Sequence, residues 1–325
     1  MKTTVIYHSA DYDGLFCREI ARKFLPDAEL IGWDYGDETM PVPEGRIYIL
    51  DLSPDCMFTK GAEPDQEVWT GLFNRIVWID HHKSAIEKWG STGSHDRIPG
   101  YRIDGVAACR LAWFYFTAWE RFLTQTTQPD LVWFHDNYPW ATKSDFIDRK
   151  LLEPLAVRLA GEYDIWDKRD PRAELFQHGL RSRALNDTIW ELLLVPFQEP
   201  DQDGKKDAGT IMVEALLEAG EALQYARTRE NESVIKANGF TIEWEGLKFL
   251  ACNHARFNSH LFTAGLKPEH DACFGFKWTG KDWSVSLYHA PGKEHHDLSL
   301  IAVKHGGGGH RGACGFRAKN ISFLT

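Results

Sequence analysis

Carboxylates and imidazoles that could bind metal ions follow three short apolar segments of this sequence. Residues 4–7 precede His8, Asp11 and Asp13, residues 47–50 precede Asp51, and residues 76–79 precede Asp80, His81 and His82. Mixed carboxylate and imidazole ligands suit Mn²⁺ and also accept Mg²⁺, Fe²⁺ or Co²⁺. Two such ions activate water and neutralise both oxygens of an in-line phosphoryl displacement. Asp11 or Asp13 alone is typical of a helix N-cap, but the whole set predicts a two-metal hydrolytic site.

The three apolar segments are the elements that must position these ligands. Each is a continuous apolar run instead of an alternating one, which is typical of parallel strands covered by helices on both faces. Ligands of such sheets bind beyond the carboxyl ends of the strands, where all three groups fall. We therefore expect an α/β domain with a mostly parallel sheet. Helices are expected after Gly14, at about 105–123 and at 151–159, with an irregular insertion at 124–150.

The later part of the chain indicates a second, smaller domain. Residues 199–209 (EPDQDGKKDAG) have the composition of a linker, and apolar residues at helical spacing after them predict a long amphipathic helix. From about Phe240 the pattern favours strands, and the glycine run 306–309 is expected to form a turn at the end of this region. We expect a metal-binding domain at 1–198, a linker and connecting helix at 199–234, and a smaller α/β domain at 235–325.

Composition limits the class of protein. The 325 residues include six scattered cysteines without a CxxC pair, which favours a reducing, cytoplasmic compartment. No apolar run reaches the roughly 18 residues that span a bilayer, and the sequence starts directly with an apolar strand segment. The net charge is −10, yet residues 235–325 carry 11 Lys and Arg against 7 Asp and Glu, a net charge of +4. An acidic half that holds cations beside a basic half that holds phosphates is one interpretation, and uneven surface charge is the other.

The motifs resemble those of the DHH phosphoesterase superfamily, in its short-oligonucleotide exonuclease or nano-RNase branch with the DHH-associated C-terminal domain. Five segments carry the resemblance, in the expected order: Asp11-Tyr12-Asp13-Gly14, Asp51, Asp80-His81-His82, Asp164 in Tyr163-Asp164-Ile165-Trp166, and the glycine-rich signature from Gly306 to Phe316. The resemblance spans almost the whole chain.

The resemblance implies a role for each metal-site residue. One ion would be bound by Asp11 and His8, the other by Asp13, His81 and Asp164, with Asp51 between the two. Asp80 would orient an imidazole, and His82 would contact the phosphate and assist the departure of the leaving oxygen. His8 stands three residues before Asp11, whereas several members of the family have four, so a satisfied strand-end histidine is the alternative for His8.

Substrate contacts are expected in the second domain. Glycine backbone N–H groups can approach an anion closely, and charged side chains can add hydrogen bonds. The candidate substrate-binding residues are Gly307, Gly308, Gly309, His310, Arg311 and Tyr288. Many relatives have Arg where Tyr288 stands, and Tyr288 suits either base stacking or core packing.

The resemblance implies Mn²⁺-dependent hydrolysis of short single-stranded oligonucleotides to mononucleotides by two ions, with Mg²⁺ or Co²⁺ as substitutes. A phosphodiesterase for cyclic or linear signalling dinucleotides is the first alternative, and a non-catalytic nucleotide-binding protein is the second. The sequence leaves open RNA or DNA preference, cleavage polarity and whether the chain forms a homodimer.

Overall fold

A computed structural model describes residues 2–35, 37–57, 75–91, 98–126, 131–167, 169–197 and 204–322, with residues 90, 91 and 131–133 described by their backbone only. The chain divides into two compact units, Met1–Glu221 and Ala222–Thr325. Within the described ranges, no helix combines the length and the apolar character that crossing a bilayer requires.

Unit 1 contains a five-stranded parallel sheet. Its strands are β1 (Thr3–His8), β2 (Glu29–Trp33), β3 (Arg46–Leu50), β4 (Ile76–Asp80) and β5 (Gly100–Arg102), in the order β2-β1-β3-β4-β5. The three strands expected from the apolar runs are β1, β3 and β4, and the expected parallel α/β class is confirmed. Strands β2 and β5 were not expected, because β2 is a half-exposed edge strand that contains Gly32 and β5 has only three residues.

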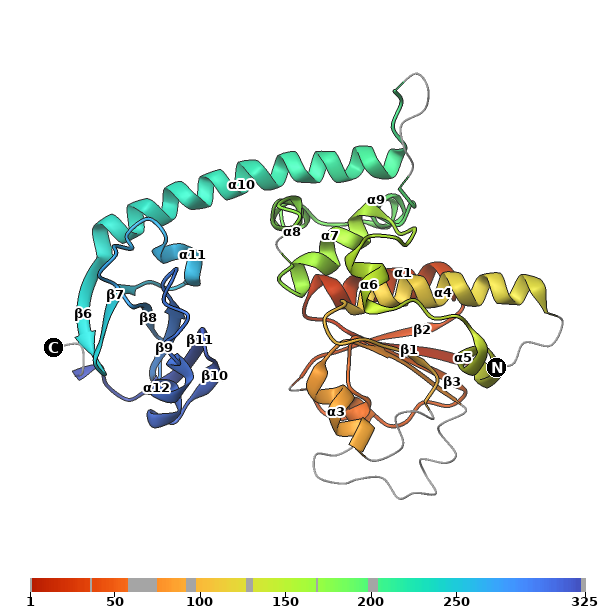
Figure 1. Cartoon of the computed structure of the whole chain (residues 1–325), viewed down its shortest axis with the longest axis horizontal. Helices are drawn as coiled ribbons and strands as arrows, with labels where there is room; N and C mark the ends of the chain where they lie inside the picture. Colours follow the sequence, from red (N-terminus) through yellow and green to blue (C-terminus); the bar gives the residue numbers. More distant parts are fainter. Residues whose placement is uncertain are drawn as a thin grey trace. The chain divides into compact units, whose positions relative to one another are not determined.

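Helices cover both faces of this sheet, as the continuous apolar runs predicted. Alternate strand residues point to opposite sides, so Val5 and Tyr7 join one apolar cluster and Ile6 joins another. The first cluster includes helices α1 (Tyr12–Phe24) and α4 (Ala108–Gln125), and the second includes α3 (Lys83–Ser91) and the short 3-10 helix η1 (Pro54–Met57). Figure 1 shows α1 and α4 on one face of the sheet and α3 on the other.

Two expectations for residues 124–159 were wrong. The stretch expected to be irregular contains α5 (Leu131–Asn137) and α6 (Lys143–Ile147), and α6 is stabilised by a capping box between Thr142 and Asp145. The following helix, α7, runs from Leu155 to Asp164 instead of 151–159. It begins late because Pro154 occupies the N-cap position, where the residue before a proline is kept out of helical conformation.

Helices α8 (Arg172–Leu180) and α9 (Asp187–Leu193) follow, and then α10 (Ala208–Asn238), which is the expected long connecting helix. The division between the two units falls inside α10. The expected linker was too long at its end, because Ala208 and Gly209 already belong to α10; residues 198–203 lie outside the described residues.

Unit 2 contains a mixed six-stranded sheet. Its strands are β6 (Gly239–Trp244), β7 (Leu247–Asn253), β8 (Ala272–Trp278), β9 (Trp283–His289), β10 (Gly308–His310) and β11 (Ala313–Ala318), in the order β10-β11-β9-β8-β7-β6. Only β7 and β8 are parallel neighbours among these described strands. Helix α12 (Leu298–Lys304) packs in one apolar cluster of the unit, and α11 (Ser259–Phe262) packs with the end of α10 in another.

The glycine run 306–309 was expected to form a turn, but its second half belongs to a strand. Gly308 and Gly309 belong to the edge strand β10, where Gly309 pairs with Cys314. A Cβ at Gly309 would come within 2.6 Å of the Cα of Cys314, and the φ angle of Gly309 is +131°. The glycine therefore permits both the backbone conformation and the close approach of β11.

Candidate metal centre

The strand ends of unit 1 bring the predicted ligands together. Three groups of donor atoms each lie within 4.8 Å of one another, in the described part of the chain: His8, Asp11 and Asp51; Asp13, His81 and Asp164; and Asp51, His81 and His82. The residues come from the carboxyl ends of β1, β3 and β4, the N-terminus of α1 and the last residue of α7. All six predicted metal ligands are in these groups.

Asp51 belongs to the first and third groups and contacts His81 of the second. Its side chain is 1% exposed, and neither carboxylate oxygen has a hydrogen-bond partner among the described residues. One oxygen is 3.3 Å from Nε2 of His81 and the other is 3.5 Å from Nδ1 of His8. Its φ angle is +60°, a left-handed conformation that Asp tolerates better than most residues. A buried carboxylate without hydrogen bonds is costly, so this carboxylate fits a cation site.

The N-terminus of α1 positions the next two carboxylates. Asp11 is the N-cap of α1: its Oδ1 accepts a hydrogen bond from Gly14 N–H at 3.0 Å, while its Oδ2 is 2.9 Å from Nδ1 of His8. The N-cap interpretation of Asp11 is thus correct without removing Asp11 from the site. Gly14 is required here, because a Cβ would come within 1.9 Å of the carbonyl oxygen of His8.

Asp13 is held by the start of another helix. It is 2% exposed, and its two oxygens accept hydrogen bonds from the backbone N–H groups of Ala108 and Cys109, both at 2.8 Å. These N–H groups begin α4, so the helix dipole favours the ionised carboxylate. Asp13 therefore has a fixed orientation before any cation binds.

His81 faces three carboxylates. Its Nε2 is 3.3 Å from Asp51 Oδ1, 3.4 Å from Asp164 Oδ2 and 3.6 Å from Asp13 Oδ2. An imidazole nitrogen and three carboxylate oxygens around one point form a donor set suited to Mn²⁺ and similar divalent ions.

Asp80 orients His82. The carboxylate is fully buried, and its Oδ1 accepts hydrogen bonds from the backbone N–H groups of His81 at 2.7 Å and His82 at 3.2 Å. The same oxygen is 2.7 Å from Nδ1 of His82. Because Nδ1 is taken, Nε2 is the nitrogen through which the His82 ring can act on another molecule.

Burial and the crowding of carboxylates favour the protonated forms of several groups in the site. Burial and neighbouring aspartates raise the pKa of Asp13 and of Asp164 to about 7. Burial lowers the pKa of His8 and His81, but the close contacts of their ring nitrogens with the surrounding negatively charged carboxylates outweigh it. They raise the pKa of His8 to about 11 and that of His81 to about 10. The site therefore concentrates negative charge that positive charge must compensate.

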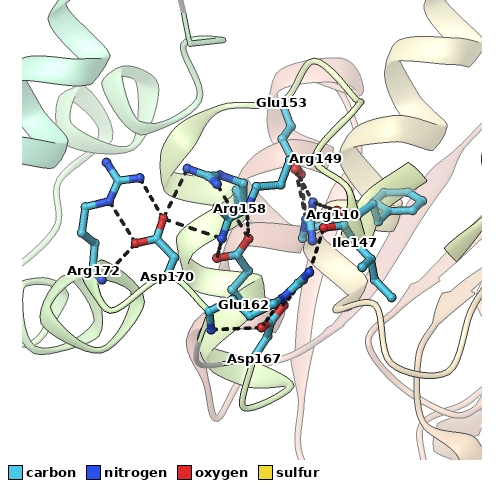
Figure 2. Close-up of polar contacts among 11 residues, drawn as sticks. Arg110, Ile147, Arg149, Glu153, Arg158, Glu162, Asp167, Asp170 and Arg172 are labelled. Carbon is cyan, nitrogen blue, oxygen red and sulfur yellow. Dashed lines mark hydrogen bonds and ion pairs between the residues drawn. The ribbon is translucent and has the colours of Figure 1, made fainter. Parts of the chain in front are cut away.

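A network of ion pairs holds α7, and with it Asp164. Figure 2 shows arginines and carboxylates alternating around this helix. The Arg149 guanidinium donates to both oxygens of the fully buried Glu162, at 3.0 and 3.1 Å. Arg158 is part of α7, and a nitrogen of its guanidinium lies 3.5 Å from Oδ2 of Asp170.

A second pair ties α7 to α4. Arg110, 2% exposed, donates to both oxygens of Glu153, the residue before Pro154. Gly161 allows the close packing, because a Cβ there would come within 2.8 Å of the Arg110 side chain. Since α4 holds Asp13 and α7 carries Asp164, this pair fixes two carboxylates of the site relative to each other.

Two residues after β2 also reach the site, and the sequence analysis missed them. Oδ1 of Asp34 is 3.1 Å from Nε2 of His8. The ring of Tyr35, which is 53% exposed, lies 5.6 Å from the ring of His8 and 6.2 Å from that of His82. Their position directly after a strand could have identified them, because a parallel strand beside β1 ends at the same edge of the sheet as β1.

The expected substrate-binding residues lie in unit 2. His310 and Arg311 are exposed at the turn between β10 and β11; Arg311 lies 3.6 Å from Asp297 and donates to the carbonyl oxygen of His295. Tyr288 is half-buried on β9, and its ring is 6.4 Å from that of Phe262. Gly307, Gly308 and Gly309 lead into the turn.

No protein-family model matches the sequence, and no curated protein matches it significantly. Solved structures similar to this chain include the pGpG-specific phosphodiesterase PggH from Vibrio cholerae, with 14% identity and a TM-score of 0.46 over 99% of this chain and 94% of that one. A manganese-bound exonuclease RecJ has 13% identity and a TM-score of 0.43, over 99% and 87% of the chains. RecJ from Thermus thermophilus with Mn²⁺ has 15% identity and a TM-score of 0.42, over 99% and 50%.

The chemistry inferred for this chain rests on its own residues.

Proposed function

We propose that this chain is a divalent-metal-dependent phosphodiesterase that hydrolyses short single-stranded oligonucleotides. The observation that carries the proposal is Asp51, a buried carboxylate without hydrogen bonds between two groups of hard and borderline ligands. His8, Asp11 and Asp51 would hold one ion, and Asp13, His81 and Asp164 the other, with Asp51 contributing to both. When bound, the two cations supply charge neutralisation for a phosphoryl group and lower the pKa of a water molecule.

His82 and Asp80 supply the protein's own part of the reaction. Nδ1 of His82 is held by Asp80 at 2.7 Å, and the side chain of His82 is 36% exposed, so its Nε2 is open to a substrate. The surrounding carboxylates raise the pKa of His82. A protonated Nε2 can donate a hydrogen bond to a phosphate oxygen and then pass its proton to the leaving oxygen.

The candidate substrate-binding residues of unit 2 would contact a phosphate of the substrate. The exposed His310 and Arg311 and the adjoining glycine backbone provide a small set of donors for one or two phosphates. Such a small set suits a short chain with a terminal phosphate better than a long polynucleotide, which needs many phosphate contacts.

The test is a parallel hydrolysis assay of the purified chain with Mn²⁺, Mg²⁺ or Co²⁺. The substrates are labelled RNA and DNA of three to five nucleotides, a 24-mer RNA, a linear 5′-phosphorylated dinucleotide and a cyclic dinucleotide. We expect mononucleotides from the short oligonucleotides, with little cleavage of the 24-mer, and loss of turnover in His81→Ala.

Other outcomes contradict the proposal in different ways. Cleavage confined to the cyclic or linear dinucleotide would replace the substrate by a signalling dinucleotide. Binding of these molecules without cleavage under any metal would mean a nucleotide-binding protein and end the enzyme interpretation.

A further inference from the structure

The edge strand β2 ends beside the metal centre. In the parallel register of β1 and β2, His8 pairs with Trp33, and Ser9 N–H donates to the carbonyl oxygen of Trp33 at 3.0 Å. The residue that follows, Asp34, is therefore delivered to the same sheet edge as the ligands that follow β1. Strand β2 therefore joins the three expected strands, β1, β3 and β4, in placing a carboxylate or imidazole at this edge.

Asp34 contacts the side of the His8 ring that faces away from the other ligands. Nδ1 of His8 lies 2.9 Å from Asp11 Oδ2 and 3.5 Å from Asp51 Oδ2, whereas Nε2 lies 3.1 Å from Asp34 Oδ1. The His8 side chain is 10% exposed and that of Asp34 is 48% exposed. One ring nitrogen thus faces the carboxylates of Asp11 and Asp51, and the other faces the carboxylate of Asp34 alone.

The Asp34 carboxylate is itself held in place. Its Oδ1 also accepts a hydrogen bond from Tyr35 N–H at 2.7 Å. Asp34 N–H donates to Asp37 Oδ2 at 2.9 Å, and Asp37 N–H donates to the carbonyl oxygen of Asp34 at 3.0 Å, which closes a turn. The ring of Tyr35 packs edge-on against the ring of His8. The turn therefore fixes both the carboxylate and the imidazole that it contacts.

We propose that Asp34 is a positioning residue for His8. It accepts the Nε2 proton of His8 and so leaves the Nδ1 lone pair directed at the ion held by Asp11 and Asp51. Histidines that bind metals usually donate their other N–H to a carboxylate in this way, which fixes the tautomer and raises the basicity of the ligand. The inference rests on the metal centre of the proposed function and does not depend on the substrate.

The test measures metal binding without any substrate. Mn²⁺ is titrated into the wild type, Asp34→Ala, Asp34→Asn and Asp27→Asn by calorimetry. Asp27 is an exposed aspartate before the other end of β2, so its variant is a matched control for charge. We expect Asp34→Ala to weaken the binding of one ion by about 10–100-fold. Asp34→Asn keeps an acceptor oxygen and should lose less, and Asp27→Asn should bind like the wild type.

A double-mutant cycle with His8→Ala separates positioning from a general effect of charge. If Asp34 acts through His8, adding Asp34→Ala to His8→Ala changes Mn²⁺ affinity by no more than about twofold. An equal loss in both backgrounds, or wild-type affinity in Asp34→Ala, overturns the proposal.

A measurement on the wild type tests the proposal even if the variants do not fold. Long-range ¹H–¹⁵N spectra of the histidine rings, in protein loaded with diamagnetic Zn²⁺, report which nitrogen of His8 carries the proton. A proton on Nε2 supports the inference, and a proton on Nδ1 refutes it. Hydrolysis plays no part in these readouts, so a failure of the proposed substrate would leave them unchanged.

Discussion

At the scale of single residues, three destabilising features occur together at Asp51. It is buried, its oxygens lack hydrogen bonds in the described structure, and its backbone is left-handed. Each of these features destabilises a metal-free fold. A residue with a purely structural role would not keep all three, and a bound cation would offset the largest of them.

Replacing Asp51 by Asn should therefore separate stability from metal binding. Asn tolerates the left-handed backbone and nearly keeps the size of the side chain, so the variant should still fold cooperatively, although it loses the carboxylate that contacts His8 and His81. Mn²⁺ at one hundred times its Kd should stabilise the wild type by about 2.7 kcal/mol, and this gain should vanish in Asp51→Asn. Thermal melts with Mn²⁺ and with EDTA check both statements; a variant that Mn²⁺ still stabilises fully would contradict them.

The raised pKa values predict how pH acts on the site. Because the pKa of Asp13 and Asp164 is raised to about 7 and that of His8 and His81 to about 10–11, the folded metal-free protein binds more protons than the unfolded chain between pH 6 and 8. The stability of the metal-free protein due to these groups should fall as pH rises through this range.

Metal binding should show the opposite trend. Cations must displace the protons on these ligands, so affinity should rise with pH and binding should release protons. Mn²⁺ titrations at pH 6, 7 and 8, in buffers of different ionisation enthalpy, measure both quantities. Affinity that is constant or falling over this range would refute the assignment of these residues as ligands.

At the scale of elements, the site depends on how α4 and α7 are joined. Helix α4 supplies N–H groups to Asp13, α7 ends in Asp164, and the buried pair of Arg110 and Glu153 connects them. Burying a pair of charges adds little net stability, but removing one partner leaves an uncompensated charge in the interior.

Arg110→Met should consequently lower the free energy of unfolding by about 3–5 kcal/mol. Replacing both partners, in Arg110→Met with Glu153→Leu, should recover most of this loss. Lys206→Met, at an exposed pair with Glu214, is the control and should change stability by less than about 1 kcal/mol. Urea unfolding measures all three, and a double variant as unstable as the single one would show that the charges themselves are required.

At the scale of the whole molecule, the proposed metal ligands and the proposed substrate-binding residues belong to different units. The proposed metal ligands all lie in Met1–Glu221, and His310 and Arg311 lie in Ala222–Thr325. A change in unit 2 should thus alter substrate binding without altering the metal centre.

His310→Ala should raise KM for a 5′-phosphorylated trinucleotide about tenfold, as expected for a lost charge-assisted hydrogen bond of about 1.5 kcal/mol. Mn²⁺ affinity should stay at the wild-type value. Lys281→Ala, an exposed cation between β8 and β9, serves as the control. Steady-state kinetics and metal titration provide the two readouts, and an unchanged KM would remove His310 from the substrate site.

The parts that sequence could predict were those with a strong local signal. Strands β1, β3 and β4 are unbroken apolar runs, so the sheet class and the shared position of the candidate ligands after them could be predicted from the sequence. Strand β2 is half-exposed and contains Gly32, so its pattern does not differ from that of a loop. Asp34 and Tyr35 were missed with it. Helix α6 depends on the cap formed by Thr142 and Asp145, a short-range effect that apolar spacing does not register.

The two groups of proposed ligands are completed at different points of the chain. His8, Asp11 and Asp51 form one group within the first 51 residues, whereas the group of Asp13 and His81 needs Asp164 at the end of α7. During synthesis, the first group therefore leaves the ribosome well before α7 exists. Capture of the second ion would follow the completion of α7, so that ion would distinguish finished molecules of unit 1 from truncated ones.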